Sequence, residues 1–175
     1  MKVSLSWLKD YVPIEMDPSD LAEALTMVGL EIESVSDRYS YLDTVYVGRI
    51  EEIAPHPNAD KLHLCQVDTG HGKVSVVCGA PNAKTDMLSP IALPGTEFPD
   101  GFILEKSVIR GQASEGMLCS EGELGLGEDR SGIMVLDQSL SVGDKLAPAL
   151  ALSDTVFEIE ITPNRPDCLS VIGVA

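Results

Sequence analysis

Four cations in the middle of the chain could hold an anionic partner. Arg49, Lys61, Lys84 and Arg110 could each pair with a phosphate oxygen, and an arginine can do so through two parallel hydrogen bonds. They are candidates for a local basic patch that binds nucleic acid. The alternative, which composition leaves open, is that they are solvated surface cations.

The charge balance limits the partners that the chain can bind. Its 175 residues include 12 Lys and Arg against 28 Asp and Glu, a formal net charge of −16. Residues 40–150 contain 8 basic and 16 acidic side chains, and both flanking segments are acidic too. Such a chain repels a polyanion unless its cations are clustered. A hydrophobic fraction of 44% excludes wholesale disorder, and no apolar run is long enough to cross a membrane.

Metal chemistry has less support. His63 and Cys65 would share one face of a strand and could bind a metal with Asp60 or Cys78. Their spacing matches no zinc motif, and the alternative is that both belong to the wall of a barrel. The carboxylates of an acidic loop could bind a hard cation or form a solvated charged surface. These carboxylates are Glu121, Glu123, Glu128 and Asp129.

No catalytic constellation is found in the chain. Ser114 lies between glycines at a spacing that does not match a nucleophile elbow. The glycine-rich stretch over 122–127 lacks the lysine of a phosphate-binding loop. We therefore predict no catalytic residue and no metal site. The four cysteines are expected to be free thiols of a cytoplasmic protein, because the N-terminus lacks a secretory signal.

Hydrophobic periodicity predicts the elements of residues 1–39. A strand is expected over 2–6, and a second strand over 30–35 with a slip in its alternation near Ser34. Between them, Asp17 suits an N-cap and Pro18 the first position of a helix that Gly29 ends. Leu21, Ala24, Leu25 and Val28 would share one face of this helix. The expected order is strand, helix, strand.

Residues 40–150 are typical of a small β-barrel. Strands are expected over 44–53, 61–68, 73–78, 87–93, 102–109 and 132–136, separated by turns rich in Gly, Pro and Asn. Closure into a barrel would remove the exposed edges of so many strands.

Residues 151–175 begin with a half-buried strand that has Phe157, Ile159 and Ile161 on one face, followed by a proline-rich loop over 162–167. The chain stops within an apolar stretch, which suggests a piece of a longer protein. We expect an α+β, mostly β fold, in which a barrel over 40–150 is inserted into a small split α+β domain of 1–39 and 151–175.

The middle segment resembles the tRNA-binding OB-fold family. Residues 47–50 and 56–62 are similar to the opening of that domain, and residues 109–120 resemble its signature R-G-x-x-S-x-G-M-x-x-S. The flanks over 1–12, 29–33 and 160–170 are similar to the bacterial phenylalanyl-tRNA synthetase β-subunit family. The chain thus resembles the N-terminal part of such a subunit. Asp86 is a departure, because relatives usually have glycine there.

The resemblance implies that the barrel is an accessory tRNA contact in support of aminoacylation. Its candidate contacts are Arg49, Lys61, Asn82, Lys84, Arg110 and Ser114. It also implies an α2β2 assembly with an α subunit that holds the catalytic centre, and ATP and magnesium bound outside these residues. The chain alone should be inactive.

Two structural alternatives remain at this point. For the signature, Gly111 and Gly116 could permit a tight bend, Ser114 could cap local amides, and Met117 could fill the barrel core. For the whole chain, the alternative is a module that supports assembly of the synthetase and does not touch RNA.

Overall fold

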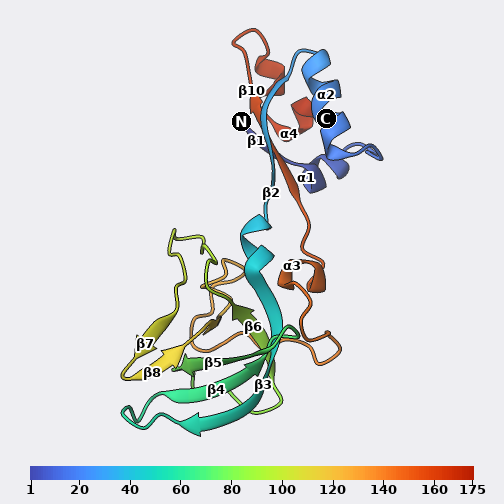
Figure 1. Cartoon of the computed structure of the whole chain (residues 1–175). Helices are drawn as coiled ribbons and strands as arrows, with labels where there is room; N and C mark the ends of the chain where they lie inside the picture. The colour runs from blue at the N-terminus through green and yellow to red at the C-terminus, as the bar shows by residue number, and fades with distance from the viewer. The chain divides into compact units, whose positions relative to one another are not determined.

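The computed structural model describes all residues from Met1 to Ala175 and divides into two compact units (Figure 1). Unit 1 comprises Met1–Ser40 and Ser153–Ala175, and unit 2 comprises Tyr41–Leu152. Unit 1 combines a sheet with helices, and unit 2 is built mainly from strands. The predicted fold class, a mostly β chain with a barrel inserted into a split α+β domain, is confirmed.

Unit 1 is centred on an antiparallel three-stranded sheet whose strands are ordered β1-β10-β2. Its strands are β1 (Lys2–Ser4), β2 (Glu31–Asp37) and β10 (Thr155–Glu160). The C-terminal strand thus lies between two N-terminal strands and joins the two parts of the unit. The helices of the unit are α1 (Leu5–Lys9), α2 (Pro18–Met27), the 3-10 turn η2 (Pro166–Cys168) and α4 (Val171–Val174).

The first strand ends earlier than its pattern predicts. The expectation of a strand over 2–6 is wrong after Ser4, where α1 begins. The Ser4 hydroxyl accepts the Trp7 amide at 3.2 Å, which is an N-cap contact. The Asp154 carboxylate accepts hydrogen bonds from the Ser4 hydroxyl at 2.7 Å and the Ser6 amide at 3.1 Å. These polar contacts favour the helix over the strand that the alternation of polar and apolar residues predicts.

Helix α2 forms where the sequence predicts it. Asp17 holds the N-cap position without a capping bond from its side chain, and Pro18 is the first helical residue. Gly29 follows the helix with a φ of +92°, the left-handed conformation that glycine adopts readily. Leu21 is buried, whereas Val28 is 67% exposed, so only part of the predicted apolar face meets the core.

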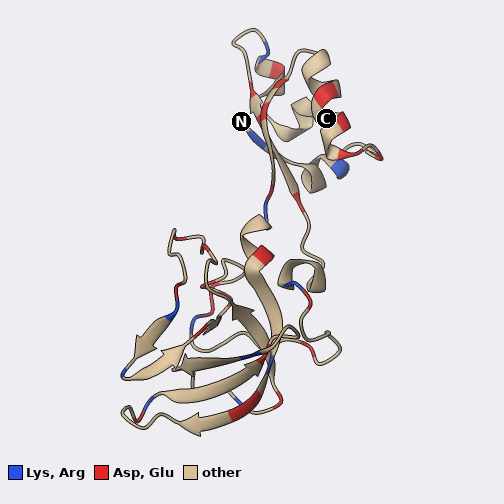
Figure 2. Cartoon of the chain, viewed as in Figure 1, with Lys and Arg blue, Asp and Glu red and all other residues tan.

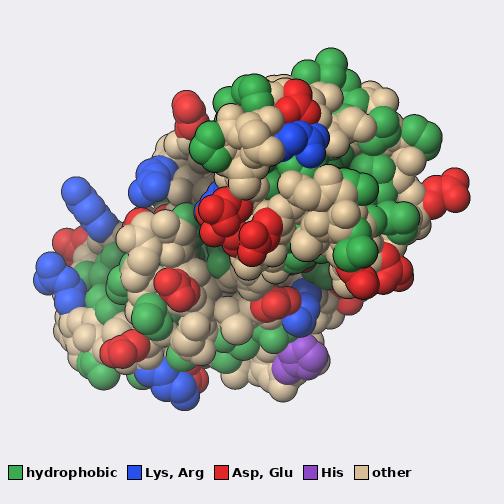
Figure 3. Space-filling model, turned by 90° about the horizontal axis from the view of Figure 1, so that it is seen from above, with side chains coloured by type: hydrophobic (Ala, Val, Ile, Leu, Met, Phe, Trp, Pro, Cys, Tyr) green, Lys and Arg blue, Asp and Glu red, His purple; other side chains and the backbone are tan.

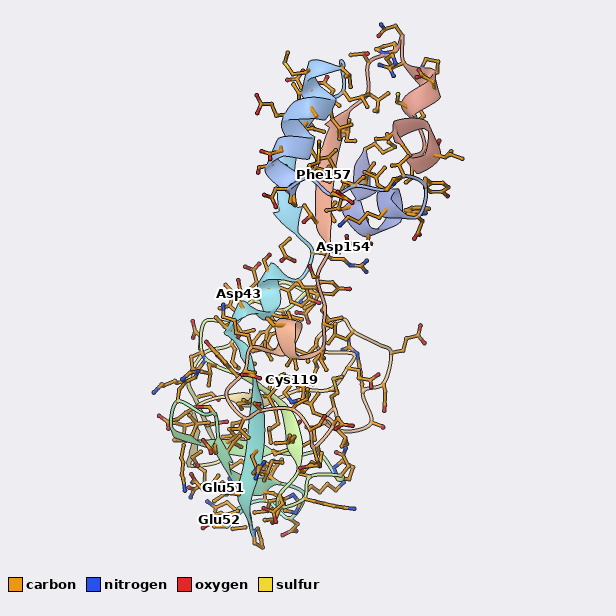
Figure 4. The ribbon with its side chains drawn as sticks, turned by 90° about the vertical axis from the view of Figure 1, so that its right-hand side faces the viewer. Asp43, Glu51, Glu52, Cys119, Asp154 and Phe157 are labelled. Carbon is orange, nitrogen blue, oxygen red and sulfur yellow. The ribbon has the colours of Figure 1, made fainter.

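The slip predicted near Ser34 is confirmed as a register shift between β2 and β10. Glu158 pairs with Ser34 and Ile159 pairs with Ile32, which leaves an extra residue in β2. On β10, Phe157 and Ile159 are completely buried, and Figure 4 labels Phe157 on this strand. They form the core of unit 1 together with residues from both of its parts, namely Val3, Leu5, Leu8, Leu21, Leu30, Cys168 and Val171.

Unit 2 contains an antiparallel five-stranded sheet ordered β5-β4-β3-β6-β9. Its strands are β3 (Val45–Pro55), β4 (His63–Asp68), β5 (Lys73–Cys78), β6 (Leu88–Ala92) and β9 (Met117–Leu118). The Glu115 amide donates to the Ser75 carbonyl at 2.8 Å and so joins the segment before β9 to the edge strand β5. This order and this closing contact are those of a small OB-type barrel.

Shorter elements complete unit 2. The hairpin of β7 (Ser107–Ile109) and β8 (Gln112–Ser114) lies in the connection between β6 and β9. The 3-10 turn η1 (Ser40–Thr44) precedes β3, and α3 (Leu146–Ala149) follows the barrel. No helix in either unit has the length and apolar composition needed to span a bilayer.

One of the predicted strands is longer than the strand that forms, and another is wrong. Of residues 102–109, only β7 is a strand, because Phe98 donates to the Phe102 carbonyl at 2.8 Å and closes a tight turn of its own. Residues 132–136 form no ladder because their amides have separate partners. The Met134 amide donates to the Cys119 carbonyl, and the Leu136 amide donates to the Leu88 carbonyl.

Candidate nucleic-acid interface

Arg110 lies at the tip of the β7–β8 hairpin. In Figure 2 the tip of this hairpin has the blue of Lys and Arg. Ile109 pairs with Gln112, so Arg110 and Gly111 are the two central residues of the turn. Their φ angles are 48° and 88°, as a type I′ hairpin turn requires. Glycine adopts this conformation freely, whereas for an arginine it is strained. Strain of this kind is often found at functional positions.

Lys61 lies in the loop between β3 and β4, and buried His56 ties this loop to the hairpin. The His56 Nδ1 accepts the Asn58 amide at 3.1 Å, so Nε2 carries the proton that it donates to the Ile109 carbonyl at 3.1 Å. The Asn58 side-chain amide donates to the Arg110 carbonyl, also at 3.1 Å. The loop and the hairpin tip are therefore held side by side.

The two segments enclose a cleft of about 430 Å³, which we call the loop cleft. It is lined by Asn58, Ala59, Asp60, Lys61, Leu62 and Arg110. None of the four ion pairs of the structure involves Lys61 or Arg110, so both cations are free to meet an external anion. An ammonium and a guanidinium at one cleft are suited to the phosphates of an RNA backbone.

Arg49, the predicted contact that lies on a strand, belongs to a different surface. Arg49 lies on β3 directly opposite Asp68, and the neighbouring Lys73 forms an ion pair with Glu51 at 2.7 Å. Figure 4 labels Glu51 and Glu52 next to each other on β3. Acids therefore accompany these cations. Arg49 is also about 20 Å along the strand from its Pro55 end, at about 3.3 Å per residue.

Lys84 does not line the loop cleft and lies in the turn before β6. The Asp86 amide in the same turn donates to the Ile50 carbonyl at 2.7 Å. Asp86 has a φ of 64°, a conformation that glycine adopts more readily than other residues. Basic side chains also stand apart from one another, among acidic and hydrophobic ones, on the face shown in Figure 3.

Asn82 and Ser114 use their side chains inside the barrel. The Asn82 amide donates to the Ile133 carbonyl at 2.8 Å and accepts the Ile133 amide at 3.0 Å. The Ser114 hydroxyl accepts the Val77 amide at 3.1 Å and donates to the Gly116 carbonyl at 3.0 Å. These contacts match the structural alternative for Ser114. The structure therefore brings together Lys61 and Arg110 from the set of predicted contacts.

The cysteines are all free and buried. Cys65 and Cys78 interact across β4 and β5, and the Ala80 amide donates to the Cys78 sulfur at 3.4 Å. The Cys65 thiol and this amide lower the pKa of Cys78 to about 7, against the effect of burial, whereas the contact with Cys78 raises the pKa of Cys65. Across the whole chain, no three His, Cys, Asp or Glu side chains gather where they could hold a metal ion.

The acidic loop after β9 uses its carboxylates to fix its own shape. Glu123 accepts the amide and the hydroxyl of Ser120, both at 2.7 Å. Asp129 accepts the Ser131 amide at 2.8 Å, and this hydrogen bond lowers the pKa of the carboxyl group. Arg130 donates to the Gly122 carbonyl at 2.9 Å. The loop is thus an ordered charged surface.

Sequence reasoning missed His56 and Asn58 as residues that position the cleft. Both belong to the 56–62 stretch that carries the family resemblance, but neither was assigned a role there. The His56 ring bonds the nearby Asn58 amide and also the Ile109 carbonyl, which is 53 residues away in the sequence. No spacing along the chain reveals this distant partner.

The barrel and its loop cleft define a class of protein. OB-fold barrels bind oligonucleotides with the connections between strands 1 and 2 and between strands 4 and 5. Here these connections are the β3–β4 loop with Lys61 and the β6–β9 connection with Arg110. Residues 45–145 match the family model described as "Putative tRNA binding domain". This match covers more than half of the chain, which therefore belongs to that family.

The relatives match along the whole chain. It is 53% identical over 175 residues to the phenylalanine–tRNA ligase beta subunit of Syntrophus aciditrophicus. It is 47% identical over 176 residues to the subunit of the same description from Nitratidesulfovibrio vulgaris. In both cases the alignment includes 100% of this chain and 22% of the relative, so the chain spans about a fifth of the length of these proteins.

Solved structures with low sequence identity also match. The C-terminal domain of Plasmodium vivax p43 has a TM-score of 0.42 and 21% identity, covering 58% of this chain and 57% of that one. A MetRS related protein from Pyrococcus horikoshii has a TM-score of 0.45 and 16% identity, covering 76% and 99%.

Proposed function

We propose that this chain is the N-terminal region of a phenylalanine–tRNA ligase beta subunit and that unit 2 binds tRNA as an accessory contact. Lys61 and Arg110 pair with phosphates at the loop cleft, and Asn58 and His56 keep the two loops together. Arg49, Lys84, Asn82 and Ser114 stay predicted contacts, but the proposal does not depend on them.

One observation supports the proposal most. Lys61 and Arg110 lie on separate connections of the barrel, yet they line the same cleft, and neither has an acidic partner. In a protein with a net charge of −16, unpaired cations at the loops that OB folds use for nucleic acid are where a polyanion would be attracted.

Titration of tRNA at low salt tests this function. We expect the K61A/R110A variant to bind at least about tenfold more weakly than the unchanged chain, because two charge-assisted contacts are lost. K73A and K145A in combination remove the same amount of charge from unit 2, at two lysines that are held in ion pairs and do not line the loop cleft, and should change the affinity by less than about twofold. If both double variants lose the same tRNA affinity, the loss comes from net charge and not from the loop cleft, which contradicts the proposal. No tRNA binding by the unchanged chain would also refute it.

For the whole protein, we propose the activity of its relatives. The beta subunit would act with an alpha subunit in an α2β2 ligase of the cytoplasm that uses ATP and magnesium outside these residues. The chain supplies no adenylate-forming site, and its contribution is to hold tRNA. Purified alone, it should not charge tRNA with phenylalanine.

Unit 1 favours a second role, assembly with protein. Of the twelve exposed large hydrophobic residues of the chain, eight lie in unit 1, although it is the smaller unit. These are Trp7, Tyr11, Met16, Met27, Val28, Val35, Leu169 and Ile172. Where exposed hydrophobic residues gather into a contiguous surface, that surface is typical of protein contacts, and unit 1 holds most of the residues that could form one. Unit 1 would therefore support the subunit assembly while unit 2 contacts RNA.

A further inference from the structure

A second hollow of unit 2 lies along the same hairpin as the loop cleft. It has a volume of about 400 Å³ and is lined by the 102–107 segment, by β7 and β8, and by Val77 and Met117. Most of its lining is apolar, and it includes the hydroxyl residue Ser107. We call it the hairpin groove.

Phe102 offers an aromatic surface at this groove. Its ring stacks on the ring of Phe98, with centroids 5.8 Å apart and planes inclined by 27°. Phe98 is 5% exposed and Phe102 is 52% exposed, so the buried ring supports an outer ring that keeps a surface open to solvent. The Asp100 carboxylate accepts the Phe102 amide at 3.0 Å and fixes the turn that presents this ring. A supported, half-exposed ring is suited to stacking on a planar ligand.

The charges around the groove exclude a phosphate. Lys106 is the only cation in its lining, and it forms an ion pair with Glu115 at 2.9 Å. Glu105 also lines the groove, and Asp100 lies in the adjoining turn. A phosphate placed there would meet carboxylates, whereas an uncharged base would meet apolar side chains and the Ser107 hydroxyl. The chemistry therefore fits the base of a nucleotide and not its phosphate.

Consecutive residues of the hairpin line the groove and the loop cleft. Ile109 lines the hairpin groove, and its carbonyl accepts the His56 hydrogen bond that holds the cleft together. The next residue, Arg110, lines the cleft. A single RNA strand can thus place its phosphates at Lys61 and Arg110 and turn a base toward β7. The same β6–β9 connection supplies both sites, and OB folds use this connection for oligonucleotides.

We propose that the hairpin groove is a base-binding subsite for single-stranded RNA, in which an unpaired nucleobase stacks on Phe102. The subsite rests on the proposed RNA binding by unit 2 and adds to it a determinant for unpaired bases. Duplex RNA, whose bases are already stacked, does not use it.

Binding of a short single-stranded RNA that contains 2-aminopurine tests the subsite with a spectroscopic readout. We expect F102L to bind about tenfold more weakly and to lose the fluorescence quenching that stacking causes, while F102W keeps both. The salt dependence of F102L binding should parallel that of the unchanged chain, because no phosphate contact is lost. V135A, which truncates another exposed hydrophobic residue of unit 2 outside the groove, should have no effect.

The outcomes separate this subsite from the proposed function. If K61A/R110A weakens binding and F102L does not, the RNA function stands and the base subsite is refuted. If F102L keeps its RNA affinity but loses association with a partner protein, the groove is a protein contact instead. If the unchanged chain binds neither tRNA nor the single-stranded RNA, both proposals fall. Thermal unfolding checks that each variant is folded.

Discussion

Unit 1 and unit 2 differ in what they leave on their surfaces. Unit 1 exposes hydrophobic side chains such as Met27, which is 80% exposed. Unit 2 instead leaves Lys61 and Arg110 without ion pairs at one cleft, although most of its charged residues are acidic. The difference shows that net charge describes neither unit well. The position of a few unpaired groups decides what each surface can bind.

Separate cores make the comparison testable by mutation, and Phe157→Ala should have the largest effect. Phe157 is completely buried in a core formed by residues of unit 1 alone. Its truncation should destabilise unit 1 by about 3–5 kcal/mol and leave RNA binding by unit 2 in place. Unfolding by circular dichroism together with an RNA titration measures both effects. V35A, at the exposed position that pairs with Phe157 in the sheet, is the control. If Phe157→Ala abolishes RNA binding as well as destabilising unit 1, the two units do not act independently.

His56→Ala tests whether the position of the β3–β4 loop, and not only its charge, determines RNA binding by unit 2. It removes the hydrogen bond to the Ile109 carbonyl, which ties the β3–β4 loop to the hairpin, and the bond from the Asn58 amide within the loop, so chemical denaturation should show a loss of about 1–3 kcal/mol. RNA affinity should fall without a change in the salt dependence, because no cation is removed. H71A, at an exposed histidine that contacts the Tyr46 ring, serves as the control. A changed salt dependence in H56A would mean that His56 contacts RNA itself.

Asp86→Gly should stabilise unit 2 by about 0.5–1 kcal/mol, because glycine adopts the positive φ of this position without strain. Denaturation midpoints measure the change, and RNA affinity should stay the same. Asp86→Asn removes the charge but keeps a side chain at the same φ. If it stabilises as much as glycine does, charge and not backbone conformation is the cause.

Asp167→Asn should have the smallest effect, confined to acid solution. The Arg165 guanidinium lowers the pKa of Asp167 to about 2 from an ordinary value of 3.8. The ionised carboxylate therefore stabilises unit 1 fully above about pH 4, and this contribution is lost as the pH falls toward 2. Unfolding at a series of pH values should show a shallower acid loss in D167N than in the unchanged chain. D17N, at a carboxylate without a capping bond, should behave as unchanged.

Much of the fold could be predicted from the sequence, because alternation and turn residues are local signals. Such local signals predicted the barrel, helix α2 with its end at Gly29, and the register slip near Ser34. Helix α1 was missed because Ser4 and Ser6 bond to Asp154, which is distant in the sequence. The site followed the same rule. Residue types named Lys61 and Arg110 as candidates, but only the fold shows that His56 joins their loops and that acids accompany Arg49.

The salt dependence of tRNA binding tests the central claim most directly. The claim is that Lys61 and Arg110 neutralise phosphates at the loop cleft. In a plot of the logarithm of the binding constant against the logarithm of salt concentration, each lost phosphate contact reduces the slope by about 1. The account predicts a slope for K61A/R110A that is shallower by about 2 than that of the unchanged chain. Parallel lines for the two proteins would contradict it.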